Sequence, residues 1–385
     1  MKCFSLSRKI IADTLVNISP TLTVGEAASI VRFFDTYFMR GLYATARCLS
    51  FPLKWATVTK IKVKVPTRFK ILIKNIEIKI EETSHDVDNS VKLRLLRHGQ
   101  SAEFKHKLLF YVHGGAFVGP KAASLENMYI KGFASNLKGL NILCMDHPPG
   151  PESPFPIALQ QVLDTYLWLI SGRPDVEKKI GFHPEELVLM GDSSGGSLVS
   201  SLMVLLNEIR NMETNFKVLL PKSMILLFPK ITLQLDMFPS LITAVYDQLL
   251  SIQLLMNACI SYVPMLKKNE NGEWNYVEDN SSIPSDFLLN PDYKVLESPI
   301  LSPVWYDKLD QLSEVPLHVL ALGNDPLLDE ALEMGRRWKG RVRMHVVEGA
   351  GHAAFYFNYF SREGSKCVPI VTDMIRTALR EPMCD

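Results

Sequence analysis

Residues 185–206, EELVLMGDSSGGSLVSSLMVLL, join a short apolar run to a longer apolar segment through a glycine-rich turn. The first run predicts a buried strand and the second a helix. The turn, GDSSG at residues 191–195, satisfies the pattern G-x-S-x-G. Side chains at Gly191 and Gly195 would collide with neighbouring backbone where the chain turns this sharply. The stretch therefore predicts a strained strand-turn-helix elbow that exposes the hydroxyl of Ser193 as a nucleophile.

Around the elbow, short apolar runs alternate with helical stretches. The runs lie at residues 108–112, 140–145, 187–190, 224–228, 317–322 and 342–347, and helices are expected at 156–170 and 194–210 among others. This alternation indicates a mostly parallel sheet covered on both faces by helices. Upstream, alternating patterns at 60–64, 69–80 and 91–96 predict further strands. The polar segment 267–285 is expected to be an exposed loop.

A second glycine-rich turn follows the run at 108–112. Residues 109–117, LFYVHGGAF, end a predicted strand in His113-Gly114-Gly115. Without side chains, glycines let backbone N–H groups point into open space, as an oxyanion hole requires. The alternative interpretation is an ordinary turn after a strand. The Ser193 elbow elsewhere in the chain favours the oxyanion hole over this alternative.

A serine nucleophile needs a base. After Ser193 the chain holds only His318, His345 and His352. The first two lie within predicted strands, where a core or surface role is expected. His352 follows Gly349-Ala350-Gly351 in a loop after the last strand, so its ring is free to reach back to the serine.

The base needs an orienting carboxylate, which should follow the preceding strand. Residues 322–327, LGNDPL, supply Asp325 at that position. Asp329 and Glu330 are close rivals, but we expect them to begin the next helix as N-terminal charges.

Composition excludes several other classes of protein. The formal net charge is +1, with 42 basic and 41 acidic residues, so there is no electrostatic case for a nucleic-acid partner. The six cysteines are scattered, with no spacing typical of a metal site, and we expect buried free thiols in a reducing compartment. No cofactor or metal is expected.

Residues 1–57 are expected to form a helical region before the first strand. Apolar residues gather on one face of the segment 30–49, which predicts either a helix packed on the protein body or a cap helix that meets lipid. Charges near the N-terminus argue against a signal peptide, and no apolar stretch is long enough to span a membrane. We therefore expect a cytoplasmic protein, with attachment to lipid-droplet or membrane surfaces through this face as a further expectation. Its oligomeric state is not encoded in any motif.

Together HGGAF, GDSSGG, DPLLDE and GH resemble the hormone-sensitive lipase family of esterases and lipases, which has the α/β-hydrolase fold. The segment 146–152, DHPPGPE, is similar to another motif of that family. Asp325-Pro326 and the residues after it look closer to hormone-sensitive lipase than to arylacetamide deacetylase. The resemblance covers roughly residues 107–375. It implies a catalytic domain over 58–385, with an α-helical cap formed by 1–57 and an insertion at about 230–300.

The resemblance also implies roles for individual residues. Ser193, Asp325 and His352 would form the triad, and the N–H groups of Gly114, Gly115 and Ser194 would form the oxyanion hole. His113 and Asp192 belong to the same motifs and support the site. These residues predict hydrolysis of acyl esters, lipid or acylglycerol, through an acyl-enzyme.

Four positions depart from the family pattern. Ala116 replaces the third glycine of HGGG and Ser194 replaces a usual alanine. His147 and Gly150 replace tyrosine and alanine, which we expect to loosen the wall behind the oxyanion loop, the HGGAF segment at residues 113–117. Two other functions stay open: a deacetylase of arylacetamides or acetyl esters, and a non-catalytic binder like the plant gibberellin receptors. The binder is disfavoured because those receptors lack the histidine that is present here at 352.

Overall fold

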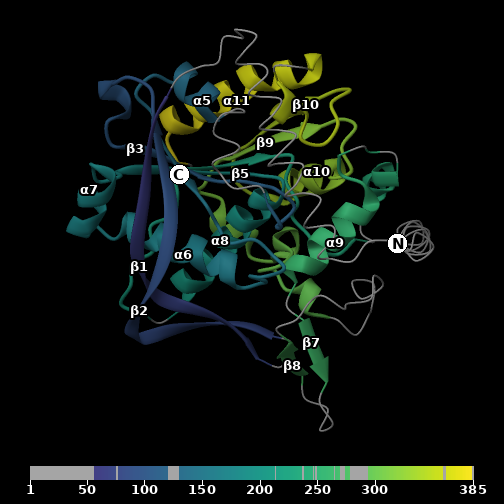
Figure 1. Ribbon diagram of the computed structural model, residues 1–385, viewed down its shortest axis with the longest axis horizontal. Coiled ribbons are helices and arrows are strands. Elements are labelled where there is room, and N and C mark those ends of the chain that lie inside the picture. The colour runs from purple at the N-terminus through teal and green to yellow at the C-terminus, as the bar shows by residue number, and fades with distance from the viewer. Residues whose placement is uncertain are drawn as a thin grey trace.

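An eight-stranded sheet runs through the protein (Figure 1). The computed structural model describes residues 56–74, 77–119, 130–212, 214–235, 238–245, 247, 249–263, 265–268, 274–277, 294–358 and 361–383. The predicted amphipathic helix at 30–49, and nearly all of the N-terminal region 1–57, lie outside the described residues. The strands are β1 (Thr57–Lys74), β2 (Glu77–Arg97), β3 (Lys107–Val112), β4 (Asn141–Met145), β5 (Glu186–Asp192), β6 (Ser223–Leu227), β9 (Leu317–Leu322) and β10 (Val342–Val347).

The strand order is β1-β2-β4-β3-β5-β6-β9-β10. β3, β4, β5, β6, β9 and β10 are parallel, while β1 and β2 add an antiparallel edge. Every residue of β4, β6 and β9 is buried, as expected for parallel strands covered on both faces. The predicted parallel sheet is confirmed.

Helices cover the two faces of the sheet (Figure 1). One core cluster joins the sheet to α6 (Ile157–Ile170), α7 (Pro174–Ile180), α8 (Ser194–Asn211) and α10 (Leu328–Arg337). The other joins it to α5 (Lys131–Asn136) and α11 (Arg362–Arg380). Successive residues of β3 alternate between the two clusters, Phe110 in the first and Tyr111 in the second. In the described ranges, none of the helices has the length and apolar character to cross a membrane.

The antiparallel edge differs from its sequence-based prediction. The alternating run at 69–80 was expected to be one strand, but β1 ends at Lys74 and β2 begins at Glu77, and the two pair along their length. The prediction is wrong because the alternation of apolar and polar residues continues in both arms of the hairpin. A register shift lies between Thr67 and Phe69, and Gln160 of α6 binds the Phe69 carbonyl beside it.

The segment before β9 carries the remaining elements. They are η4 (Pro239–Val245), α9 (Ile252–Tyr262), β7 (Met265–Lys268), β8 (Trp274–Val277), η6 (Lys294–Glu297), η7 (Pro303–Trp305) and η8 (Leu309–Leu312); η2 (Ala102–Phe104) and η9 (Ala354–Phe357) lie elsewhere in the chain. β7 and β8 form a separate antiparallel pair. The prediction of an exposed loop over 267–285 is therefore wrong at 267–268 and 274–277, because the polar composition hid a short hairpin.

Three cysteines lie in the described part of the chain. Cys144, Cys259 and Cys367 are buried thiols that form no disulfide, as predicted. Burial raises the pKa of the Cys259 thiol to about 11, which makes it a poor nucleophile. These thiols fill space in the core.

His318 of β9 makes the fold sensitive to acid. Its ring is buried, neither nitrogen has a hydrogen-bond partner within the described ranges, and burial lowers its pKa from 6.5 to about 4. The unfolded chain therefore binds more protons than the folded chain between these values, and stability falls as the pH drops through this window. We expect the free energy of unfolding to lose about 3 kcal/mol from this residue between pH 7 and pH 4.

Urea unfolding of the wild type and of His318→Leu at several pH values checks this. The stability of the variant relative to the wild type should rise as the pH falls. His345→Leu, a partly buried histidine on the neighbouring β10, is the matched control. Parallel curves for the wild type and His318→Leu would contradict the prediction.

Candidate active site

The turn between β5 and α8 has the predicted elbow geometry. Ser193 adopts φ 48° and ψ −122°, a region that non-glycine residues rarely occupy. A Cβ atom at Gly191 would lie 2.4 Å from the Gly195 carbonyl oxygen, and one at Gly195 would lie 2.2 Å from that of Val112. The predicted need for glycine on both sides of Ser193 is confirmed. The Ser193 N–H donates to the Leu227 carbonyl of β6 at 3.0 Å, which fixes the elbow to the sheet.

Ser193, His352 and Asp325 lie in one hydrogen-bonded chain. The Ser193 Oγ is 3.0 Å from His352 Nε2, and His352 Nδ1 is 2.9 and 3.0 Å from the two carboxylate oxygens of Asp325. Asp325 follows β9 and His352 follows β10, so parallel strands deliver all three residues to one edge of the sheet. The Asn324 N–H donates to the Ala350 carbonyl at 2.9 Å and ties the two loops together.

The surroundings of His352 suit a general base. Burial disfavours the charged ring, but the charge and hydrogen bond of Asp325, together with the charges of Asp247 and Asp192, outweigh it and raise the pKa of His352 above 6.5. Asp325 also accepts the Leu327 N–H at 2.8 Å, which fixes its carboxylate. The ring of Phe228 packs edge-on against the imidazole, with 5.4 Å between ring centroids. Phe228 could not be recognised from the sequence, because a lone aromatic residue at the end of a strand carries no signal.

The loop after β3 brings backbone N–H groups next to Ser193. Among the hydrogen bonds of the described residues, none uses the N–H of Gly115, Ala116 or Ser194. The N–H of Gly114, however, donates to Asp192 Oδ1 at 3.0 Å. The structure therefore differs from the expectation at Gly114: its donor is occupied, and Gly115 and Ser194 supply the free ones.

Asp192 makes more hydrogen bonds within the site than its position in the GDSSG motif indicated. It is fully buried, and it binds the hydroxyls of Tyr111 from β3 and Tyr356 from η9 besides the Gly114 N–H. Burial raises the pKa of Asp192, against these hydrogen bonds. Three donors on one carboxylate fix the residue before the nucleophile. The two tyrosines were missed because their distance from residue 192 along the chain hides the contact.

The geometry agrees with comparisons to known proteins. A family model described as the alpha/beta hydrolase fold matches residues 109–356, more than half of the chain. The chain belongs to the alpha/beta hydrolase fold family. An esterase from the archaeon Pyrobaculum calidifontis has a similar structure, with a TM-score of 0.63 and 19% identity over 96% of each chain. This likeness shows that the whole alpha/beta hydrolase fold is shared.

Two curated relatives are similar in sequence to part of this alpha/beta hydrolase. Bovine hormone-sensitive lipase is 31% identical over 172 residues, which are 45% of this chain and 21% of the relative. Rabbit arylacetamide deacetylase is 30% identical over 151 residues, 39% of this chain and 36% of the relative. The chain thus spans about a fifth of the length of the hormone-sensitive lipase that it matches. The predicted resemblance to the hormone-sensitive lipase family is confirmed.

The rival acid residues have other partners in this alpha/beta hydrolase. Asp329 and Glu330 lie in the first turn of α10, as predicted. Asp329 accepts the Ser240 N–H at 2.7 Å. Glu330 forms a buried ion pair with Lys230, at 2.5 Å, and accepts the Ile231 N–H. Because the Lys230 N–H donates to the Ser193 carbonyl at 2.9 Å, this ion pair helps to hold the elbow in place.

The wall behind the oxyanion loop is packed, which contradicts the expectation that His147 and Gly150 loosen it. The ring of His147 stacks on that of His113, with 4.3 Å between centroids, and its Nε2 lies 3.0 Å from the His113 carbonyl oxygen. A Cβ atom at Gly150 would lie 2.4 Å from the carbonyl oxygen of Ser261 in α9. Glycine at 150 therefore allows α9 to approach closely.

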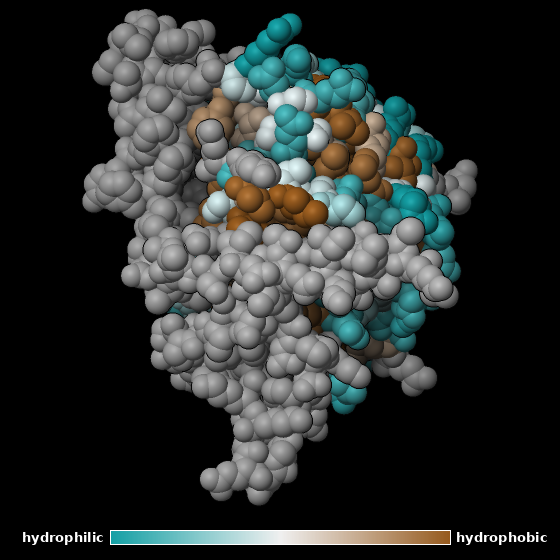
Figure 2. All heavy atoms as spheres, turned by 90° about the vertical axis from the view of Figure 1, so that its right-hand side faces the viewer, coloured by the Kyte–Doolittle hydropathy of each residue, from teal (hydrophilic) through white to brown (hydrophobic). Residues whose placement is uncertain are grey.

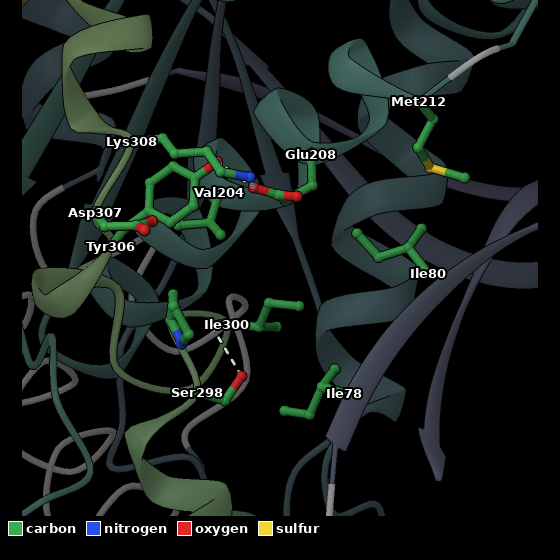
Figure 3. Close-up of a pocket in the computed structure, with 11 residues that line it drawn as sticks. Ile78, Ile80, Val204, Glu208, Met212, Ser298, Ile300, Tyr306, Asp307 and Lys308 are labelled. Atoms are coloured by element: carbon green, nitrogen blue, oxygen red, sulfur yellow. Dashed lines mark hydrogen bonds and ion pairs between the residues drawn. The ribbon is translucent and has the colours of Figure 1, made fainter.

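A cavity of about 410 Å³ opens near the other end of α8 (Figure 3). Ile78 and Ile80 of β2 face Val204 and Glu208 of α8 across it. Glu208 is about 21 Å along the helix from Ser194, by the rise of 1.5 Å per residue. Its carboxylate already binds the Tyr306 hydroxyl at 2.5 Å and the Lys308 ammonium at 2.8 Å. The cavity is therefore separate from the triad, and the carboxylate of Glu208 that lines it is already paired with Lys308.

Proposed function

We propose that the protein is a serine carboxylic-ester hydrolase that acts on acyl esters, with lipid esters or acylglycerols as the substrate class. The observation that carries this proposal is the hydrogen-bonded chain from Ser193 through His352 to Asp325, next to free N–H donors. Hormone-sensitive lipase and esterases among the similar proteins support it. Because the chain spans only part of those curated relatives, the proposal of this activity rests on the geometry of the chain's own site.

The first half of the reaction forms an acyl-enzyme. His352 Nε2 takes the proton of the Ser193 hydroxyl as Oγ attacks the ester carbonyl carbon. The carbonyl oxygen becomes negative and accepts hydrogen bonds from the N–H groups of Gly115 and Ser194. The N-terminus of α8 adds its positive end at the same place. His352 then gives the proton to the leaving alcohol, and Asp325 stabilises the imidazolium throughout.

The second half releases the acid. A water molecule takes the place of the alcohol, and His352 removes its proton as the oxygen attacks the acyl carbon. The same N–H groups hold the second oxyanion. Collapse of this intermediate returns the proton to Ser193 Oγ and frees the carboxylic acid. These steps need no group beyond the side chains and backbone named here.

Apolar surroundings support a substrate with apolar acyl chains. Phe117, directly after the oxyanion loop, stacks on Tyr262 of α9, with 4.1 Å between centroids, and Phe155 meets the same tyrosine edge-on. Figure 2 shows apolar residues gathered on the side of the molecule where α9 and α10 lie in Figure 1. We propose that α9, within the 230–300 insertion, forms part of the cap over the site around Ser193. A cytoplasmic location with contact to lipid surfaces remains a prediction from sequence.

A substrate panel tests the proposed function. p-Nitrophenyl esters of increasing acyl length, triacylglycerol emulsions and arylamides are offered to the wild type and to Ser193→Ala at equal concentration. We expect the wild type to hydrolyse the esters and to prefer them over arylamides by at least about tenfold. This preference is expected because resonance makes an amide carbonyl less electrophilic than an ester carbonyl, and because the amide nitrogen must be protonated before it can leave.

Each alternative function has its own outcome in the panel. Preferential cleavage of arylamides would contradict the proposed esterase function and support the deacetylase hypothesis. Binding without turnover of any substrate would favour the non-catalytic binder, which the 3.0 Å contact between Ser193 and His352 argues against.

A further inference from the structure

The oxyanion loop holds two adjacent non-glycine residues in the left-handed region. Ala116 has φ 54° and Phe117 has φ 59°. A Cβ atom makes this backbone conformation unfavourable, so it persists only where neighbours hold it in place. The hormone-sensitive lipase family usually has glycine at the position of Ala116, and glycine would relieve that strain. Something else in this chain must therefore stabilise the loop.

Phe117 is held on three sides. Its N–H donates to the Ser194 Oγ at 3.2 Å, and its carbonyl accepts the Gly150 N–H at 2.8 Å. Its ring stacks on Tyr262, and only 4% of the residue is exposed. Of these three contacts, the hydrogen bond to Ser194 links the loop directly to the residue that follows the nucleophile.

The other end of the loop is held from the other side of the nucleophile. Asp192 accepts the Gly114 N–H at 3.0 Å. The residues before and after Ser193 thus bind the two ends of a short segment, and Gly115 and Ala116 lie between the two attachment points. Their free N–H groups keep a fixed position relative to Ser193 because the elbow itself holds the loop.

We propose that the Ser194 hydroxyl is a positioning residue that holds the oxyanion loop in its left-handed conformation and so compensates for alanine at 116. Serine at 194 and alanine at 116 are then linked departures from the family pattern. Without the hydroxyl, the strained loop relaxes and its N–H groups turn away from the developing oxyanion. The inference rests on the proposed function for its effect on rate, but not for its effect on the loop.

Two measurements test the pair. Ser194→Ala should lower kcat on a p-nitrophenyl ester about three- to tenfold, the range expected for one hydrogen bond, with little change in KM. In an Ala116→Gly background, the same substitution should cost less than about twofold. Ser200→Ala is the matched control, since this buried serine of the same helix has a hydroxyl without a partner in the described ranges.

Hydrogen exchange of residues 113–118, read by mass spectrometry, gives a result independent of turnover. Ser194→Ala should speed exchange of this segment, and Ser200→Ala should not. Unchanged exchange, or an equal loss of kcat in both backgrounds at position 116, would overturn the inference. A wild type without ester turnover would overturn the proposed function alone, and the exchange result would still decide the role of Ser194.

Discussion

Alanine at position 193 is expected to lower kcat for a p-nitrophenyl acyl ester by about 10⁵-fold or more, to near the rate in buffer. The hydroxyl oxygen is the atom that attacks, and no neighbouring side chain of the described site offers another nucleophile at its place. Ser193 is 7% exposed and its elbow is fixed by backbone contacts, so the small substitution should leave the fold intact. Steady-state kinetics with purified protein measures the loss.

The control for Ser193→Ala is structural. Its circular dichroism and midpoint of thermal unfolding should match those of the wild type within a few degrees. A well-folded Ser193→Ala protein that keeps more than about one hundredth of wild-type turnover would contradict the role of this residue.

Asparagine at position 325 is expected to lower kcat by about 10³- to 10⁴-fold. The substitution keeps the shape of Asp325 but removes the charge that stabilises the His352 imidazolium. It also offers an amide N–H to a ring nitrogen, which favours the wrong tautomer of the base. Asp329→Asn, on the first turn of α10, is the matched control and should change kcat by less than about threefold.

The pH profile adds a second readout for Asp325→Asn. His352 must be neutral to accept the proton of Ser193, and its pKa is raised above 6.5, against the effect of burial, by Asp325 first and by the charges of Asp247 and Asp192 after it. Activity of the wild type should therefore rise as the pH increases through a midpoint above 6.5. Removing the charge should move this midpoint to lower pH. An unchanged midpoint would contradict the assigned partner of His352.

The local parts of the site could be predicted from the sequence. The elbow depends on five consecutive residues, and steric exclusion at Gly191 and Gly195 leaves glycine as the residue that fits. Asp325 and His352 could be chosen because parallel strands deliver the loops that follow them to one edge of the sheet. Both choices use chain order and strand ends, which the apolar runs mark clearly.

Contacts between distant segments could not be predicted in this way. The Gly114 donor was expected to be free, but Asp192, 78 positions further along the chain, accepts it. His147 was expected to loosen a wall that its stacked ring in fact fills. The pattern of alternating residues does not mark where a hairpin turns, so the boundary between β1 and β2 was missed. Each of these outcomes depends on side-chain packing rather than on a local pattern.

The ion pair between Lys230 and Glu330, which helps to hold the elbow, is another contact between distant segments that the sequence does not predict. Lys230 and Glu330 are 100 positions apart, and neither carries a motif that names the other. Together they occupy a place where an isolated charge would be costly, so each requires its partner. A buried ion pair of this kind becomes visible only once the strands and α10 are placed.

Labelling by a fluorophosphonate probe tests the central claim most directly, because the reagent reacts with a serine only where a base and an oxyanion hole activate it. Mass spectrometry of the digested protein should find one adduct, on the peptide that contains Ser193. An ester substrate should compete with the label, and both Ser193→Ala and His352→Ala should abolish it. A wild-type protein that takes no label, or takes it on another residue, would contradict the assignment of Ser193 as an activated nucleophile.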